Sequence, residues 1–144
     1  MLEFDTDGTK QAEHFINAVG EDLSGRLIPA VEVRLRGLYR LLPPDYYEAA
    51  DNLADFCDRI EKQYGVRPVI YCTERTYKNI VASDSRFNKD KIWYESLFSK
   101  PDEDMNWTFW TYTNRVKFSF YESGEYLHMT VFNGSEDDFK KLIL

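Results

Sequence analysis

The chain has 144 residues, a formal net charge of −7 and an aromatic content of 16%. This charge argues against a nucleic-acid-binding surface, which needs clustered Lys and Arg, and against attraction to anionic membranes. The aromatic content excludes a disordered chain, and the length fits one packed domain over residues 1–144. Two uses of the aromatic rings stay open, namely filling a core and lining a groove that binds sugars or peptides.

The first half of the chain alternates between helical and strand patterns. Residues 9–19 carry apolar side chains at helical spacing, which predicts a short helix. Residues 27–33 form an apolar run of strand length, in which Pro29 favours a strand start or an edge. The clearest helix covers residues 44–64, with Asp45 placed to cap its beginning.

The second half is richer in strands. A buried strand over 68–72 is followed by Thr73, which can cap a short helix that reaches residue 81. A turn at 122–125 joins the last two of the following strands as a hairpin. These strands cover residues 91–94, 107–112, 116–120 and 127–131, and a short helix over 135–142 closes the chain.

Helices that alternate with apolar strands predict the α/β class, with a parallel sheet. No apolar run approaches the ~20 residues that span a membrane. The first residues lack the basic and then apolar region of a signal peptide, so we expect no export signal in this chain.

The cysteines and histidines do not predict a metal site. Cys57 falls on a predicted helix and Cys72 at a predicted strand end, and their spacing matches no metal-binding or CxxC motif. We expect two buried free thiols, and a disulfide only if the helix packs over that strand end. The two histidines, at positions 14 and 128, lie far from both cysteines, so we expect neither a metal nor another cofactor.

Five segments, which together cover nearly the whole chain, occur in the order found in one known family. They read FDTDGTKQAEHFINAV, LIPAVEV, GVRPVIYCTERTYKNIV, NWTFWTYTNR and VFNGSEDDFKKL. In this order they resemble the lysozymes, or N-acetylmuramidases, of glycoside hydrolase family 25. The resemblance implies an incomplete (β/α) barrel of the family 25 type, which lacks about the first three strands and has a β-rich C-terminal part. It also implies a groove at the C-terminal ends of the strands and a peptidoglycan substrate, cut between N-acetylmuramic acid and N-acetylglucosamine.

The sequence departs from this family at the catalytic acids. The family places acids on its first strand, at an Asp-x-Glu strand end and near its last strand. The first has no counterpart here, the second position reads Glu32-Val33-Arg34, and at the third His128 stands in place of Asp. A guanidinium is a very poor proton donor, so Glu32 is the remaining candidate acid, with His128 as a conceivable acid or base near neutral pH.

Both of these residues have a simpler interpretation. Glu32 and Arg34 are two residues apart on one predicted strand, so their side chains share a face and can form an ion pair. His128 can be an ordinary strand residue that faces solvent or a partner. The candidate substrate-binding residues implied by the resemblance are Tyr71, Trp107, Trp110, Tyr112 and Arg34.

We therefore expect a muramidase-related domain that is associated with bacterial cell-wall peptidoglycan, is impaired in catalysis and acts as a binding or interaction module. Two alternatives stay open, namely an active muramidase that uses Glu32 and a fragment of a longer enzyme. The resemblance implies action at the cell wall or outside the cell, with peptidoglycan glycan as a partner. An incomplete barrel has open sheet edges, which predict a homo-oligomer or a protein partner at such an edge.

Overall fold

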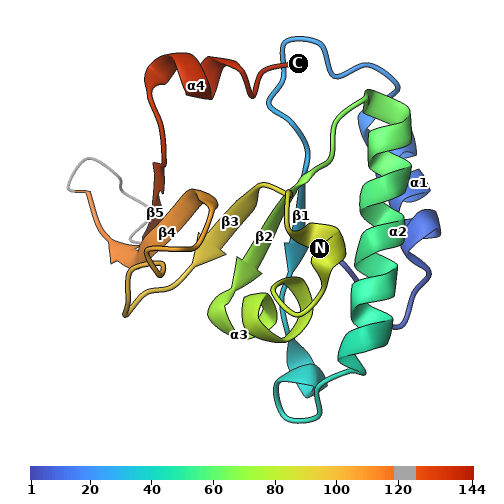
Figure 1. The fold of residues 1–144 in the computed structure, drawn as a ribbon, viewed down its shortest axis with the longest axis horizontal. Coiled ribbons are helices and arrows are strands. Elements are labelled where there is room, and N and C mark those ends of the chain that lie inside the picture. The colour runs from blue at the N-terminus through green and yellow to red at the C-terminus, as the bar shows by residue number, and fades with distance from the viewer. Residues whose placement is uncertain (119–125) are drawn as a thin grey trace.

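A five-stranded sheet organises the computed structural model, which describes residues 1–118 and 126–144. The strands lie in the order β1-β2-β3-β4-β5, in which β1 to β4 are parallel and β5 pairs antiparallel with β4 (Figure 1). The parallel sheet that the sequence predicts is therefore present. The strands are β1 Ala30–Val33, β2 Val69–Thr73, β3 Ile92–Glu95, β4 Trp107–Val116 and β5 Leu127–Phe132.

The helices lie where the local sequence predicts, but the longest begins at residue 46 instead of 44 and the last ends at residue 140 instead of 142. The Asp45 side chain accepts a hydrogen bond from the backbone N–H of Tyr47, and Gly65 ends the longest helix with φ at 74°. Glycine adopts this left-handed conformation without a steric cost. Within the described residues, no helix is both long and apolar enough to cross a membrane. The helices are α1 Gly8–Val19, α2 Tyr46–Tyr64, α3 Glu74–Thr76 and α4 Glu136–Lys140, with 3₁₀ helices at Gly37–Arg40 and Ser85–Phe87 and a π-helical turn at Tyr77–Val81.

The first strand is shorter than predicted. It begins at Ala30 instead of residue 27, because the preceding residues pair with the C-terminal end of the chain. The backbone N–H of Ile28 donates to the carbonyl of Leu142 at 2.9 Å. The C-terminal residues therefore hold the chain just before it enters the sheet.

The fourth strand is longer than predicted. It joins the predicted strand over 107–112 to the first residue of the one over 116–120. Residues 119 and 120, with the predicted turn at 122–125, lie outside the described residues. The antiparallel pairing of β4 with β5 agrees with the expected hairpin.

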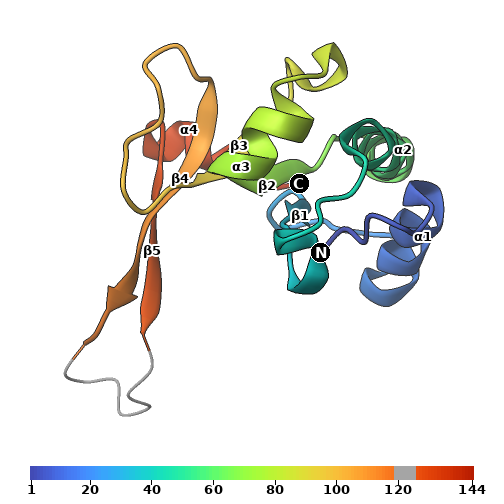
Figure 2. The same cartoon turned by 90° about the horizontal axis from the view of Figure 1, so that it is seen from below.

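The two faces of the sheet differ because side chains alternate along each strand. Figure 2 shows α2 and α3 on the same side of the sheet. The side chains that point toward these helices are buried and apolar, and they form the core with the apolar faces of α1 and α2. They are Val31, Val33, Ile70, Cys72, Ile92 and Tyr94.

The two cysteines belong to this core. Cys57 in α2 and Cys72 in β2 are buried free thiols, as predicted. Burial raises the pKa of the Cys57 thiol to about 12 and raises that of Cys72 as well. Both thiols therefore stay protonated and unreactive at neutral pH.

Helices α1 and α2 touch at a glycine. The backbone N–H of Gly8 donates to the Asn52 side chain at 3.2 Å, and that side chain donates in turn to the carbonyl of Phe4. A β-carbon added to Gly8 would lie 1.9 Å from the backbone oxygen of Asn52. A larger residue at position 8 must therefore push the two helices apart.

We expect the substitution Gly8→Ala to lower the free energy of unfolding by about 2–3 kcal/mol, because forcing packed elements apart costs in this range. Chemical denaturation followed by circular dichroism measures the change. Lys10→Ala, at an exposed position of the same helix, is the matched control and should change stability by less than ~0.5 kcal/mol. Equal stability of Gly8→Ala and the wild type would mean that α1 and α2 are not packed this closely.

Candidate functional site

The side chain of Arg34 lies between two carboxylates. Its Nε atom donates to Glu32 at 2.7 Å, and its Nη1 and Nη2 atoms donate to the two carboxylate oxygens of Glu95 at 3.0 and 2.5 Å. Nη2 also donates to the hydroxyl of Tyr71 at 3.0 Å, and this hydroxyl donates to Glu95. Arg36 adds a second guanidinium, 3.2 and 3.3 Å from the two oxygens of Glu32. We call these five side chains the charged cluster.

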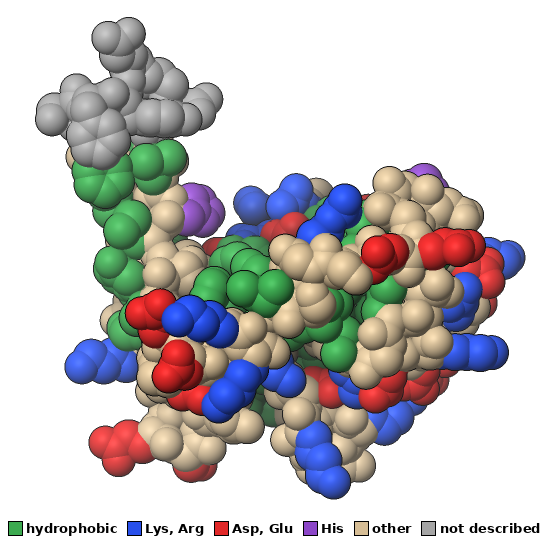
Figure 3. All heavy atoms as spheres, turned by 90° about the horizontal axis from the view of Figure 1, so that it is seen from above, with side chains coloured by type: hydrophobic (Ala, Val, Ile, Leu, Met, Phe, Trp, Pro, Cys, Tyr) green, Lys and Arg blue, Asp and Glu red, His purple; other side chains and the backbone are tan. Residues whose placement is uncertain are grey.

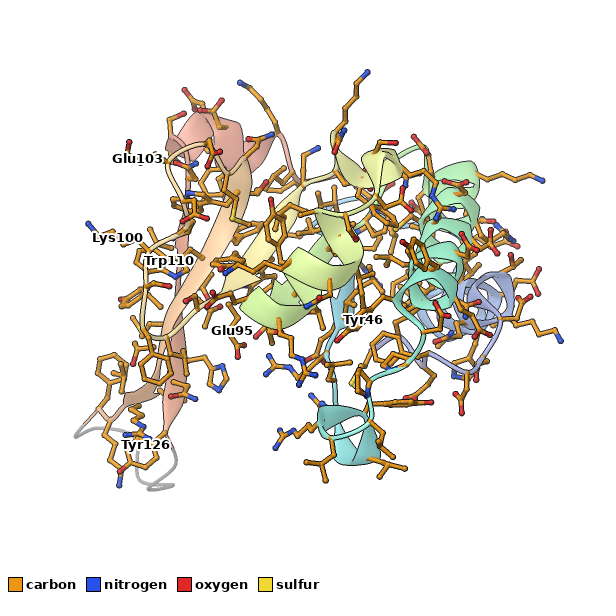
Figure 4. The ribbon with its side chains drawn as sticks, turned by 60° about the horizontal axis from the view of Figure 1, so that its bottom comes forward. Tyr46, Glu95, Lys100, Glu103, Trp110 and Tyr126 are labelled. Carbon is orange, nitrogen blue, oxygen red and sulfur yellow. The ribbon has the colours of Figure 1, made fainter. Side chains whose placement is uncertain are left out.

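The parallel register brings the charged cluster together. Glu32 on β1 lies opposite Tyr71 on β2, and Glu95 is the last residue of β3. Arg34 follows Glu32 by two residues, so both side chains point to the same side of the chain. Because the carboxyl ends of parallel strands meet at one edge of a sheet, these side chains converge where such folds commonly bind ligands. Figure 4 shows Glu95 projecting from the end of β3 into the space beside the β4–β5 hairpin.

Hydrogen bonds keep the protonation states in the cluster fixed at neutral pH. Burial raises the pKa of Glu95, but hydrogen bonds from Arg34 and Tyr71, together with the charges of Arg34 and His128, outweigh burial and lower it overall. The hydrogen bonds to Glu95 and Glu32 outweigh burial and raise the pKa of Arg34. Burial, and then the hydrogen bond to Glu95, raise the pKa of Tyr71. None of these three groups is therefore suited to deliver a proton near neutral pH.

A groove of about 430 Å³ runs beside the two arginines. The N-terminal residues and the 3₁₀ helix Gly37–Arg40 contribute to its other walls. Figure 3 also shows the surface hollowed between the β4–β5 hairpin and the rest of the molecule, with basic and acidic side chains on the wall opposite the hairpin. The charged cluster is thus accessible to a ligand, since the Arg34 and Glu32 side chains keep about a fifth of their area exposed (20% and 23%).

The structure brings Glu32, Arg34 and Tyr71 together and confirms the ion pair that the spacing of Glu32 and Arg34 predicts. His128 lies on β5, where its charge acts on Glu95. Within the described residues, the partners of the Glu32 carboxylate are Arg34 and Arg36. The catalytic pair of Glu32 with His128 that the sequence left open is therefore not formed in the described structure.

The other three aromatic residues expected to bind substrate, Trp107, Trp110 and Tyr112, lie on the other face of the sheet, on β4. Trp110 is opposite Tyr94, whose side chain is buried on the side of the helices, and opposite residues of paired strands share a face. The Trp110 indole N–H donates to the backbone carbonyl of Ser96. Trp107 and Tyr112 pack against Trp110, with ring centroids 6.2 and 5.7 Å away. These rings form a separate aromatic cluster and do not join Arg34.

Sequence reasoning missed Glu95. The predicted strand ended at residue 94, one position too early, so the carboxylate was not placed at a strand end. Its signal was present in the alternation of buried Ile92 and Tyr94 with Trp93 and Glu95, which puts Glu95 on the same face as Tyr71. Trp93 lay inside the predicted strand, but its side chain was not assigned to a face.

Trp93 belongs to a row of rings that crosses this face of the sheet. Its ring centroid lies 4.8 Å from that of Tyr71 and 5.3 Å from that of Phe109, and Phe132 continues the row at 5.4 Å from Phe109. The Trp93 indole N–H donates to the Thr111 hydroxyl at 2.9 Å. Tyr71 belongs both to this row and to the charged cluster, so the row continues the cluster across the same face of the sheet. The described residues contain no group of three His, Cys, Asp or Glu side chains that could hold a metal ion.

A family model described as "Glycosyl hydrolases family 25" matches residues 2–119. The chain belongs to glycosyl hydrolase family 25. A solved family 25 glycosyl hydrolase from Bacillus anthracis matches 99% of this chain with a TM-score of 0.84 and 29% sequence identity. The α/β fold of the family 25 type is thereby confirmed. This family 25 chain spans 65% of the length of that structure.

Two more distant structures agree with this family 25 domain in fold. A bacterial lysozyme from Streptomyces coelicolor is 23% identical, covers 96% of this chain and 67% of its own length, and has a TM-score of 0.72. A family 25 lysozyme from Aspergillus fumigatus is 18% identical, covers 96% of this chain and 68% of its own, and has a TM-score of 0.71. None of the curated proteins matches the chain significantly.

The ion pair of Arg34 with Glu95 should make stability depend on pH. The pKa of Glu95 is lower in the folded state than in the unfolded chain, so the pair stabilises the fold above the unfolded carboxyl value of ~4.3. This contribution is lost as the pH falls through the lower folded pKa. We expect Arg34→Met to lower the free energy of unfolding at neutral pH by roughly 2–3 kcal/mol, less than the ~3–5 for breaking a fully buried pair. In this variant, acidification should destabilise the fold less than it does in the wild type.

Denaturant titrations at several pH values measure this effect, and a double-mutant cycle with Glu95→Gln isolates the pair. Arg59→Met is the matched control, because Arg59 contacts the exposed Glu13 at a longer distance of 3.8 Å. If Arg34→Met and the wild type lost the same stability on acidification, Glu95 would not be held by Arg34.

Proposed function

We propose that this family 25 domain binds peptidoglycan glycan at the carboxyl ends of β1 to β3 and does not cleave it. The position of Arg34 carries the proposal, because its guanidinium donates hydrogen bonds to both Glu32 and Glu95. In the family pattern that the sequence resembles, Arg34 stands in the place of the proton-donating Glu. The solved structures that share this fold include proteins described as lysozymes.

The arrangement of the cluster does not favour hydrolysis. A glycosidase protonates the leaving oxygen with one carboxyl group and uses a second carboxylate as nucleophile or base, with the sugar between them. Here a guanidinium lies between the carboxylates of Glu32 and Glu95 and binds both. The lowered pKa of Glu95 keeps it ionised, so it accepts hydrogen bonds and does not donate a proton.

The same arrangement favours the binding of a polar, carboxylate-bearing sugar. The groove beside the cluster is lined by Arg34 and Arg36, and 55% of the Arg36 side chain is exposed. A guanidinium binds carboxylates with two parallel hydrogen bonds, and N-acetylmuramic acid carries such a group. The Tyr71 hydroxyl and ring add a polar contact and an apolar surface at the same end of the sheet.

An active muramidase that uses Glu32 is the weaker alternative. Two arginines hold the Glu32 carboxylate, so its oxygens already accept hydrogen bonds from guanidinium groups and do not face a leaving oxygen alone. His128 lies close enough for its charge to act on Glu95, but the described contacts give it no role at Glu32. The lysis experiment below decides between the two functions.

Sedimentation with insoluble peptidoglycan tests the binding. We expect the wild-type domain to sediment with the cell-wall material, and Arg36→Ala to weaken this binding about tenfold, the value of roughly one charged hydrogen bond. Arg36 is half exposed, so its loss should leave the fold intact. Arg59→Ala, on α2 and away from the groove, is the matched control and should bind like the wild type. Equal binding by Arg36→Ala and the wild type would place the glycan elsewhere, and no sedimentation of the wild type would refute glycan binding.

Turbidity of a cell-wall suspension tests the absence of cleavage. We expect the wild-type domain to leave the turbidity unchanged, because Arg34 stands in the place of the family's proton donor and Glu95 stays ionised near neutral pH. Glu32→Gln should behave in the same way. A fall in turbidity that disappears in Glu32→Gln would overturn the proposal and establish an active muramidase.

A further inference from the structure

Helix α1 does not cover a strand of the sheet. It packs against α2, with the rings of Phe15 and Phe56 at 6.4 Å, and Figure 2 shows it beyond β1, the strand at that edge. Between α1 and β1 lies a groove of about 450 Å³, lined by Ala30 and Val31 on the sheet side and by Phe15 and Ala18 on the helix side. The space between β1 and α1 is therefore a groove with mainly apolar walls.

The backbone along this groove can accept another strand at Ala30. β1 pairs with β2 on one side, and on the other side the Glu32 carbonyl accepts a hydrogen bond from the N–H of Leu2 at 2.8 Å. Because alternate residues of a strand direct their backbone groups to opposite edges, Ala30 faces the same edge as Glu32 and Ile28. The N–H of Ile28 donates to Leu142, so Ala30 is the residue between these two that is left to pair with another strand. Unpaired strand edges of this kind recruit further strands.

At the other end of the sheet, β5 is an edge strand. Helix α4 contacts one face of it, where Phe139 packs on Phe132, and the described structure places no helix over the other face. Val131 lies opposite Trp110, so it faces the side of the sheet that the helices cover elsewhere. Its side chain is 40% exposed, and Leu127 and Met129 alternate on to the same face. The molecule thus has, at one edge, a helix that lacks a strand and, at the other edge, a strand whose Val131 face lacks a helix.

The large exposed area of the chain indicates that a partner covers the surface at these two sheet edges. The chain exposes 9252 Å². A monomer of 17.0 kDa is expected to expose roughly 7700 Å². The excess of about 1500 Å² is larger than the ~800 Å² that each partner buries in a stable interface of standard size. The projecting hairpin that carries β5 contributes to this excess.

We propose that two copies of this chain complete each other, with β5 of one copy lying in the groove between α1 and β1 of the other. A two-fold axis makes the same contact twice, so both open edges of each sheet are covered and the assembly stops at a dimer. In this dimer α1 covers a strand and the Val131 face contacts a helix. The inference rests on the two sheet edges and is independent of the proposed glycan binding.

Light scattering coupled to size-exclusion chromatography tests the proposal. We expect a mass of about twice 17.0 kDa for the wild-type chain. Ala18→Arg fills the groove from an exposed helical position, and Val131→Asp puts a charge on the covered face of β5, so each variant should run as a monomer. Leu41→Asp, at a position that is 81% exposed and lies in neither edge, is the matched control and should stay dimeric.

Mixing the two monomeric variants separates a lost contact from a damaged fold. A dimer of either variant with itself has no intact contact, whereas the mixed dimer keeps one, between the groove of Val131→Asp and the β5 strand of Ala18→Arg. We expect the mixture to form dimers at a lower concentration than either variant alone. A monomeric wild type, variants that stay dimeric, or a mixture that associates no better than its components would each overturn the proposal.

Discussion

The site depends on one guanidinium shared by two carboxylates. Arg34 is mostly shielded from water, and its charge is compatible with that position because Glu32 and Glu95 both accept its hydrogen bonds. The reverse also holds, since two half-buried carboxylates this close would repel each other without the arginine. The interaction ties the ends of β1 and β3 together across β2, whose Tyr71 hydroxyl completes the hydrogen bonds.

This constraint links the fold to the function. A parallel sheet gathers side chains from distant parts of the chain at its carboxyl ends, and in this family 25 chain the charged cluster occupies that edge with charges that neutralise one another. Such a cluster can hold a polar ligand through the exposed guanidinium of Arg36, and its Glu95 stays ionised at neutral pH and donates no proton. The row of rings from Tyr71 to Phe132 gives the cluster a rigid support on the same face.

Much of the fold follows from local sequence. Helical periodicity, Asp45 and Thr73 as caps, and the alternation of Leu127 to Phe132 predicted elements that the structure contains. The ion pair of Glu32 with Arg34 was also predictable, because spacing two on a strand is a local rule. The contact with Glu95 was not, since it joins residues 61 positions apart and depends on the parallel register of three strands. The face of the sheet on which Trp110 lies was likewise not predictable from local sequence. The pairing of Trp110 with Tyr94 sets this face, and the register of β3 and β4 shifts nearby.

Whether Arg34 binds Glu95 tightly enough to keep it ionised can be measured at the side-chain carboxyl carbon of Glu95. A pH titration followed by NMR of the side-chain carboxyl carbons of glutamate reports the pKa of each group, and Glu95→Gln assigns its signal. We expect the pKa of Glu95 to lie below the ordinary glutamate range, and the signal of this carboxyl to change further when Arg34 is replaced by Met. A Glu95 that titrates near neutral pH would instead be a competent proton donor, and would contradict the account of a site that binds without cleaving.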